Sequence, residues 1–227
     1  INSTISGNTC GTAGGGIYNG GGTTVHFNNV TITNNTAGTS AAASRSGGGI
    51  NNNGPSDGFT FQNAIIAGNR DLGLLPAPDC FAEAGNGLPV TSLGYNLIQN
   101  TTHCTILGDT TGNLTGVDPH LGLLLDNSGL TRTHALAADS PALDAGNPAA
   151  PGSGGTACAA IDQRGINRLQ DGDEDGAGRC DIGAFELAES AVGFLFSGIR
   201  PNAAGNSGSA YALLYGSGFV SGMTVEL

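Results

Sequence analysis

A short motif recurs in the first seventy residues, and this recurrence constrains the fold more than any other feature. The segment NSTISGN at 2–8 is followed by NVTITNN at 29–35 and NAIIAGN at 63–69, at offsets of 27 and 34 residues. A second motif, GGGIYN at 14–19, returns as GGGINN at 47–52. Self-similarity at this spacing indicates stacked structural units, each of which buries its apolar side only against the next.

Apolar side chains alternate with polar ones inside each unit, as in Val25 and Phe27, Val30 and Ile32. A period of two residues is typical of β-strands. Glycine and asparagine interrupt the alternation every few residues, which leaves room for about three short strands per unit. The pattern therefore predicts an all-β solenoid, a parallel β-helix.

The offsets also predict which side chains stack. We expect two inward-facing isoleucine ladders, two corner ladders of asparagine, and the intervening threonines and His26 on the outer face. The isoleucine ladders are Ile17 on Ile50, and Ile5 on Ile32 on Ile66; the asparagine ladders are Asn2, Asn29 and Asn63, and Asn8, Asn35 and Asn69. Asparagine suits a corner because it tolerates a left-handed backbone and its amide can bond the equivalent residue one coil away.

The glycine clusters are interpreted as tight corners rather than as phosphate-binding loops. A Walker loop needs a lysine, and all seven cationic residues of this chain are arginines. Glycine is favoured at such corners because it adopts backbone conformations that other residues avoid.

The repeats become weaker after about residue 70, and the sequence pattern changes again near residue 191. We expect residues 71–116 and 117–187 to form irregular last coils that cap the open end of the solenoid. Residues 1–190 are thus predicted to form an N-terminally incomplete β-helix, because the chain opens at Ile1 in mid-repeat. Residues 191–227, with alternating segments near 210–215 and 223–227, predict the first strands of a β-sandwich.

Five cysteines lie at positions 10, 80, 104, 158 and 180, without the clustered spacing of a zinc site. Cys80–Cys104 and Cys158–Cys180 are the natural local disulfides. Each would close a loop of roughly 20 residues, worth about 3 kcal/mol in loop entropy. This pairing leaves Cys10 over and indicates an oxidising compartment.

The formal net charge of −11 disfavours nucleic acid and anionic membrane surfaces as partners. No apolar run approaches the length of about 18 residues that a membrane span needs. We therefore expect no nucleic acid partner and no membrane insertion of this part of the chain.

Further motifs are SLGYNLI at 92–98, DSPALDAG at 139–146 and RCDIGAFE at 179–186. Together with the repeats, they resemble the bacterial choice-of-anchor Q domain over residues 1–187. The resemblance implies a right-handed parallel β-helix in a secreted or cell-surface protein, with no established catalytic residues. The segment 191–227, with GIRPNAAG and GSGFVSGMTVEL, is similar to the start of an IPT/TIG immunoglobulin-like domain.

The acidic loop at 171–176, DGDEDG, is the best candidate for a site. Asp171, Asp173 and Asp175 followed by glycine match the first half of a calcium loop. Position 12 is Ile182 instead of a bidentate glutamate, so Asp181, Glu174 or backbone carbonyls would complete the shell. The alternatives are a structural Ca²⁺ site and a solvated acidic turn; no other cofactor is expected.

A second polar group lies near the same predicted disulfide, where Arg164 is expected to pair with Asp181 or Glu186. The four histidines are widely separated in the sequence, and His120 and His134 are expected to act as hydrogen-bonding residues.

These features favour a non-catalytic structural or adhesive surface module, including a subunit of a surface filament. The expected partners are other copies of the chain or cell-surface glycans. The alternative is a polysaccharide lyase or glycan hydrolase of the pectate-lyase-like class, for which no catalytic residue is identified. No acidic position repeats from coil to coil, as a catalytic face of two carboxylates would need.

Overall fold

The computed structural model describes residues 1–21, 24–40, 46–53, 58–82, 89–188, 195–200 and 213–217. The chain divides into two compact units, Ile1–Glu189 and Ser190–Leu227, which are treated separately below. The described residues are all-β and contain no α-helix. Accordingly, none of their elements is a helix long and apolar enough to cross a membrane.

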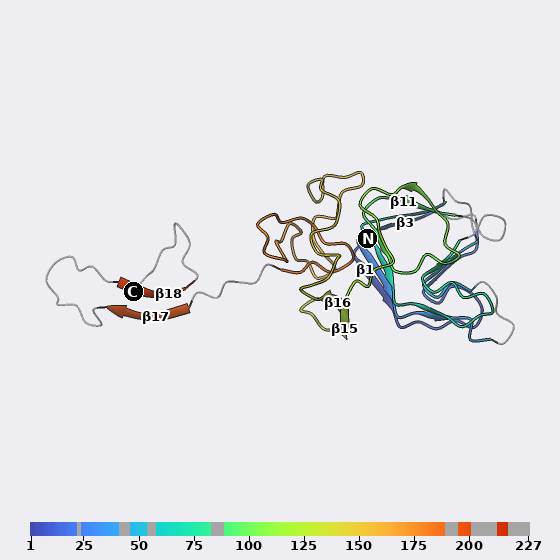
Figure 1. The fold of residues 1–227 in the computed structure, drawn as a ribbon, viewed down its shortest axis with the longest axis horizontal. Coiled ribbons are helices and arrows are strands. Elements are labelled where there is room, and N and C mark those ends of the chain that lie inside the picture. Colours follow the sequence, from blue (N-terminus) through green and yellow to red (C-terminus); the bar gives the residue numbers. More distant parts are fainter. Residues whose placement is uncertain are drawn as a thin grey trace. The chain divides into compact units, whose positions relative to one another are not determined.

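Three parallel sheets form the body of unit 1, and the chain contributes strands to them in rotation (Figure 1). The first sheet contains, in spatial order, β1 (Ser3–Ser6), β4 (Val30–Thr33), β8 (Ile65–Ala67), β12 (Leu97–Ile98) and β14 (Leu114–Thr115). The second contains β2 (Ile17–Asn19), β6 (Ile50–Asn52) and β10 (Cys80–Phe81). The third contains β3 (Val25–Asn28), β7 (Phe59–Gln62), β11 (Val90–Leu93) and β13 (Ile106–Asp109). A short parallel pair, β5 (Thr36–Ala37) and β9 (Arg70–Asp71), lies at one corner.

The two isoleucine ladders are confirmed by the strand register. Ile17 pairs with Ile50 between β2 and β6. Ile5 pairs with Ile32, and Ile32 with Ile66, across β1, β4 and β8. These side chains pack into one apolar interior with residues of the third sheet. The period of two residues therefore predicted the interior residues correctly.

The glycine clusters form corners, as predicted. Gly14 and Gly47 open the two motifs with left-handed backbone, at φ of 66° and 64°. The third glycine of each motif instead permits close packing of neighbouring coils. A Cβ on Gly49 would lie 2.5 Å from the carbonyl oxygen of Asp79, and one on Gly16 would lie 2.8 Å from that of Gly49.

Asn2, Asn29 and Asn63 turn the chain with left-handed backbone, at φ of 48°, 53° and 48°. Their side chains do not form a ladder with one another; they bind the C-terminal part of the unit. Asn29 Oδ1, for example, accepts a hydrogen bond of 2.8 Å from the backbone amide of Ala159. This corner therefore attaches the C-terminal part of unit 1 to the coils.

Asn8, Asn35 and Asn69 form the second corner and do bond one coil to the next. The Asn8 amide donates to Asn35 Oδ1 at 2.9 Å, and the Asn35 amide donates to Asn69 Oδ1 at 2.9 Å. The ladder continues in a residue of a different type, because the Asn69 amide donates to Asp79 Oδ1 at 2.9 Å. Burial raises the pKa of Asp79 to about 6.

Residues 117–188 lie against the outer face of the first sheet, which corrects the predicted cap over the end of the solenoid. Ile65 and Leu97 of that sheet are fully buried against a second apolar cluster containing Ile182 and Phe185. The coils themselves continue regularly through β14, so residues 89–115 are less irregular than predicted. The segment packs against the side of the stacked coils, because the first sheet presents apolar side chains on its outer face as well as on its inner face.

Thr31 of the first sheet lies on its outer face, as predicted, but the covering segment buries it. Thr31 and Thr33 are buried, and the backbone amide of Ala184 donates to Thr31 Oγ1 at 3.0 Å. His26, on the third sheet, is exposed as predicted.

The rest of the segment contains a hairpin and long turns. The antiparallel strands β15 (Leu121–Leu125) and β16 (Thr133–Leu136) form the hairpin. Both predicted disulfides are confirmed: Cys80–Cys104, with Cα atoms 5.3 Å apart, and Cys158–Cys180, with Cα atoms 6.5 Å apart. Cys10 is a half-buried free thiol. The two disulfides suggest an oxidising environment.

Unit 2 is described only through two antiparallel strands, β17 (Leu195–Arg200) and β18 (Leu213–Ser217). The segment predicted near 210–215 overlaps β18, whereas the one near 223–227 lies outside the described residues. β17 was not anticipated as a strand in the sequence.

Candidate functional site

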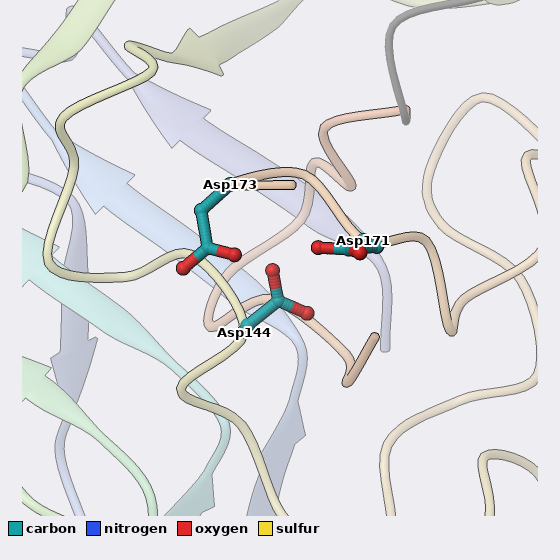
Figure 2. A group of neighbouring side chains, drawn as sticks. All are labelled: Asp144, Asp171 and Asp173. Atoms are coloured by element: carbon teal, nitrogen blue, oxygen red, sulfur yellow. The ribbon is translucent and has the colours of Figure 1, made fainter. Parts of the chain in front are cut away.

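Three carboxylates of unit 1 converge at the acidic loop (Figure 2). One oxygen atom of each of Asp144, Asp171 and Asp173 lies within 4.8 Å of the other two. Asp171 and Asp173 come from the DGDEDG loop, and Asp144 comes from the DSPALDAG turn. Ca²⁺ takes about six to eight oxygen ligands in proteins, of which these carboxylates could supply a part.

Backbone amides hold the loop in this shape. Asp171 accepts from the amides of Asp175 and Gly176, at 3.0 and 2.8 Å. Asp144 accepts from the amides of Arg179 and Gly172, at 2.5 and 3.2 Å. Partial burial, and to a lesser extent the charge of Asp173, raises the pKa of Asp144. A cation placed among the three carboxylates would relieve that repulsion.

Two of the four predicted calcium ligands belong to this group, and two do not. Asp175 Oδ1 instead accepts from the amide of Ala177 at 2.9 Å. Asp181 is buried, and it accepts from the amides of Asp144 and Leu187, at 2.9 and 2.6 Å. Asp144 takes the third place, and nothing in the local spacing of the loop could have identified a residue so far upstream.

A buried charged cluster lies beside the acidic loop and joins Arg168 to Glu186. Arg168 Nη1 lies 3.0 Å from Glu186 Oε2, and both side chains are fully buried. Glu186 also accepts from the amides of Asp181 and Leu169, at 2.9 and 3.1 Å. Arg168 Nη2 donates to Asn2 Oδ1 at 3.2 Å, which ties the cluster to the residue before β1.

Burial is the main cause of the shifted pKa values in this cluster. It raises the pKa of Asp181 to about 8, and the neighbouring charge of Glu186 acts in the same direction. It also raises the pKa of Glu186, although the Arg168 guanidinium opposes that change. The pKa of Arg168 is lowered, because burial outweighs the attraction of the nearby carboxylates.

The predicted pairing of Arg164 with Asp181 or Glu186 is wrong. The Arg164 Nε atom lies 2.8 Å from Asp162 Oδ2, and its guanidinium stacks 3.6 Å from the centre of the Phe185 ring. Arg164 contacts Glu186 only through that residue's backbone carbonyl. The Glu186 carboxylate pairs with Arg168 instead.

His134 makes a contact that the sequence did not suggest. Its Nδ1 lies 2.7 Å from the carbonyl oxygen of Gly122, and its Nε2 lies 2.8 Å from Ser6 Oγ. Because a carbonyl only accepts, Nδ1 carries a proton, and in the neutral ring Ser6 donates to Nε2. The expected hydrogen-bonding role of His134 is confirmed, and the contact pins β1 to β16. His120 Nδ1 lies 3.2 Å from Asp139 Oδ1. The expected hydrogen-bonding role of His120 stays a prediction.

Two shallow hollows border the contact between the first sheet and residues 117–188. One, of about 230 Å³, is lined by polar residues that include Thr33, Asn34, Gln99 and Asp118. The other, of about 490 Å³, lies beside β1 and is lined by residues of β1 and of the β15–β16 loop. Hydroxyl and amide side chains dominate the lining of the larger hollow, which suits ligands rich in hydroxyl groups.

Comparison with known protein families, with curated proteins and with solved structures finds no match to this chain.

Proposed function

We propose that unit 1 is a right-handed parallel β-helix, as its resemblance to choice-of-anchor Q domains implies, and that it is a secreted, cell-surface module with a structural or adhesive role. The parallel strands and their rotation among three sheets support the helix. A crossover between parallel strands of one sheet is right-handed in about 98% of known cases.

The observation that carries the non-catalytic role is the way the charged side chains are used. Glu186 and Asp162 are buried and accept hydrogen bonds from arginines and backbone amides. Asp181 is buried under backbone amides in the same manner. Carboxylates committed in this way stabilise the packing of residues 117–188 and are unavailable to transfer protons to a glycosidic bond.

The oxidising environment suggested by the disulfides supports secretion. A disulfide-closed, hydrogen-bonded solenoid resists unfolding and proteolysis, which a surface module requires. The polar hollows beside the first sheet supply a place for glycan contact.

Calcium at Asp144, Asp171 and Asp173 forms part of this proposal, with a structural role. The ion would join the DGDEDG loop to the DSPALDAG turn, next to the Cys158–Cys180 disulfide. Titration of the chain with Ca²⁺ should raise its melting temperature by mass action, and Asp144→Asn should abolish the rise. An unchanged melting temperature up to millimolar Ca²⁺ would remove the ion from the proposal.

Adhesion and cleavage can be separated in one experiment. The immobilised 227-residue chain is presented with a panel of neutral and acidic polysaccharides, and both retention and newly formed chain ends are measured. Retention without cleavage is the expected result. Release of new chain ends from any polymer would overturn the structural role in favour of a lyase or hydrolase.

A further inference from the structure

The larger hollow, beside β1, combines features of a built binding site. It has a volume of about 490 Å³ and lies between β1 and the loop that joins β15 to β16. We call it the β1 groove. Its lining consists of Asn2, Ser3, Thr4, Leu130, Thr131, Arg132 and Gln163.

Arg132 gives the β1 groove a positive charge in a strongly acidic protein. It is exposed and is the one charged residue in the lining. In the part of the chain that the structure describes, Arg132 has no ion-pair partner, whereas Arg164 and Arg168 both pair with carboxylates. An uncompensated guanidinium in a groove without carboxylates favours an anionic ligand, and its planar fork matches a carboxylate.

Gln163 fixes the direction of the hydrogen bonds in the groove. Its Nε2 donates to the carbonyl oxygen of Arg132 at 3.3 Å and to Thr131 Oγ1 at 2.8 Å. Its Oε1 accepts from Thr4 Oγ1 at 2.7 Å. A carbonyl only accepts, so the orientation of the amide is determined.

Thr131 and Thr4 are consequently left with opposite capacities toward a ligand. Thr131 Oγ1 accepts from Gln163 and keeps its own proton to donate. Thr4 gives its proton to Gln163 and keeps a lone pair that can accept. A donor and an acceptor therefore lie near the Arg132 cation, as the vicinal hydroxyl groups of a sugar require.

Leu130 adds an apolar surface to this polar set, because it is fully exposed and belongs to the same lining as Arg132. A pyranose ring has apolar faces bordered by hydroxyl groups, and a hexuronate adds one carboxylate. We propose that the β1 groove binds a hexuronate residue of an acidic polysaccharide, with Arg132 pairing with its carboxylate. The inference rests on the adhesive function proposed above and names the class of glycan.

The test compares three ligands that differ only in charge or composition. Binding of trigalacturonate, its methyl ester and a neutral galactose trisaccharide to the 227-residue chain is measured by calorimetry and by ligand-observed NMR. Trigalacturonate should bind, and the uncharged ester should bind at least about tenfold more weakly, because a charge-assisted hydrogen bond is lost. Raising the salt concentration should weaken binding of the acid and leave the ester unchanged.

Arg132→Ala should reduce the affinity for trigalacturonate by about tenfold, and Arg132→Lys should reduce it less, because the charge remains but the planar fork is lost. Arg70→Ala is the matched control, since Arg70 is also exposed but lies in β9, outside the groove. It should leave the affinity unchanged. Equal melting temperatures of the three variants establish that each is folded.

Three results would overturn the assignment: equal affinity for acid and ester, equal losses in the Arg132 and Arg70 variants, or tighter binding of a peptide with a free C-terminal carboxylate. If any of these occurs while the immobilised chain still retains polysaccharides, the groove assignment fails and the adhesive function stands. If the chain retains no glycan at all, both fail.

Discussion

The coils of residues 1–115 and the segment 117–188 are stabilised in different ways. The coils repeat a motif, and their interior is a stack of apolar side chains such as Ile32, Ile66 and Phe61. The segment has no repeat. The Arg168–Glu186 pair and a disulfide hold it together internally. A second apolar cluster and hydrogen bonds to corner asparagines such as Asn2 and Asn29 attach it to the coils. The coils are stabilised by contacts that repeat from one coil to the next, apolar in the interior and polar at the asparagine corner. The segment depends instead on individual polar partners that do not repeat.

The difference has an energetic consequence. Full burial of an isoleucine or phenylalanine contributes about 1.5–3 kcal/mol, so the coils divide their stability among many equivalent contacts. A buried charge costs several kcal/mol of desolvation, and only its partner offsets that cost. The segment therefore depends on a few residues, each of which leaves an uncompensated group behind when it is removed.

Removal of the buried cation should have the largest effect. Arg168→Ala leaves the Glu186 carboxylate buried without its ion-pair partner and breaks the link to Asn2. We expect a loss of about 3–5 kcal/mol in the free energy of unfolding, measured by denaturant titration. Arg70→Ala, at an exposed position, is the control and should stay within about 0.5 kcal/mol of the parent. A loss of similar size in the two variants would contradict the contrast between coils and segment.

The next effect tests whether the segment is docked as firmly as the coils are packed. Ile66 lies in the interior of the coils, and its neighbour Ile65 lies under residues 117–188. Each alanine substitution should cost about 2–5 kcal/mol, because both side chains are fully buried. Unfolding is followed by denaturant titration of both variants. A loss below about 1 kcal/mol for Ile65→Ala alone would mean that the segment covers the sheet only loosely.

The same pair of residues shows what could be predicted from the sequence. A period of two identified Ile66 as an interior residue, since its repeats lie at the same position in earlier units. The adjacent doublets Ile65–Ile66 and Leu97–Ile98 break that period. Consecutive apolar residues in a strand are typical of a sheet buried on both faces, so the covering segment had a signal in the sequence.

The polar contacts of the segment had no such signal. Asp144 approaches Asp171 and Asp173, and Arg164 selects Asp162 instead of the two predicted carboxylates. The partners are determined by the path that the long loops take over the first sheet. No local periodicity in the sequence encodes that path. The local disulfides were predictable, because short loops close at a small entropic cost.

A smaller effect separates glycines that pack coils together from a glycine that does not. Gly49→Ala places a Cβ 2.5 Å from the carbonyl oxygen of Asp79, so neighbouring coils must shift. We expect a loss of about 1–3 kcal/mol in the free energy of unfolding. Gly122 in β15 is the control, because a Cβ there lies 3.5 Å from its nearest neighbour. If Gly122→Ala is as destabilising as Gly49→Ala, close packing does not explain the glycine clusters.

A further test is a pH dependence that distinguishes the two regions. Burial raises the pKa of Asp79 in the coils to about 6 and, together with the charge of Glu186, that of Asp181 in the segment to about 8. A raised pKa means that the folded protein binds the proton more tightly than the unfolded chain does. The contribution of each bound proton to the free energy of unfolding is therefore complete below pH ~4 and is lost as the pH rises through the pKa of the folded protein.

Calorimetric melting measures this loss of stability with rising pH. Asp79→Asn should flatten the decline in stability between about pH 4 and 6, and Asp181→Asn should flatten it up to about pH 8. If Asp181→Asn keeps the decline of the parent above about pH 7, Asp181 is ionised in the folded protein, and the buried cluster is held by its backbone amides and Arg168 alone.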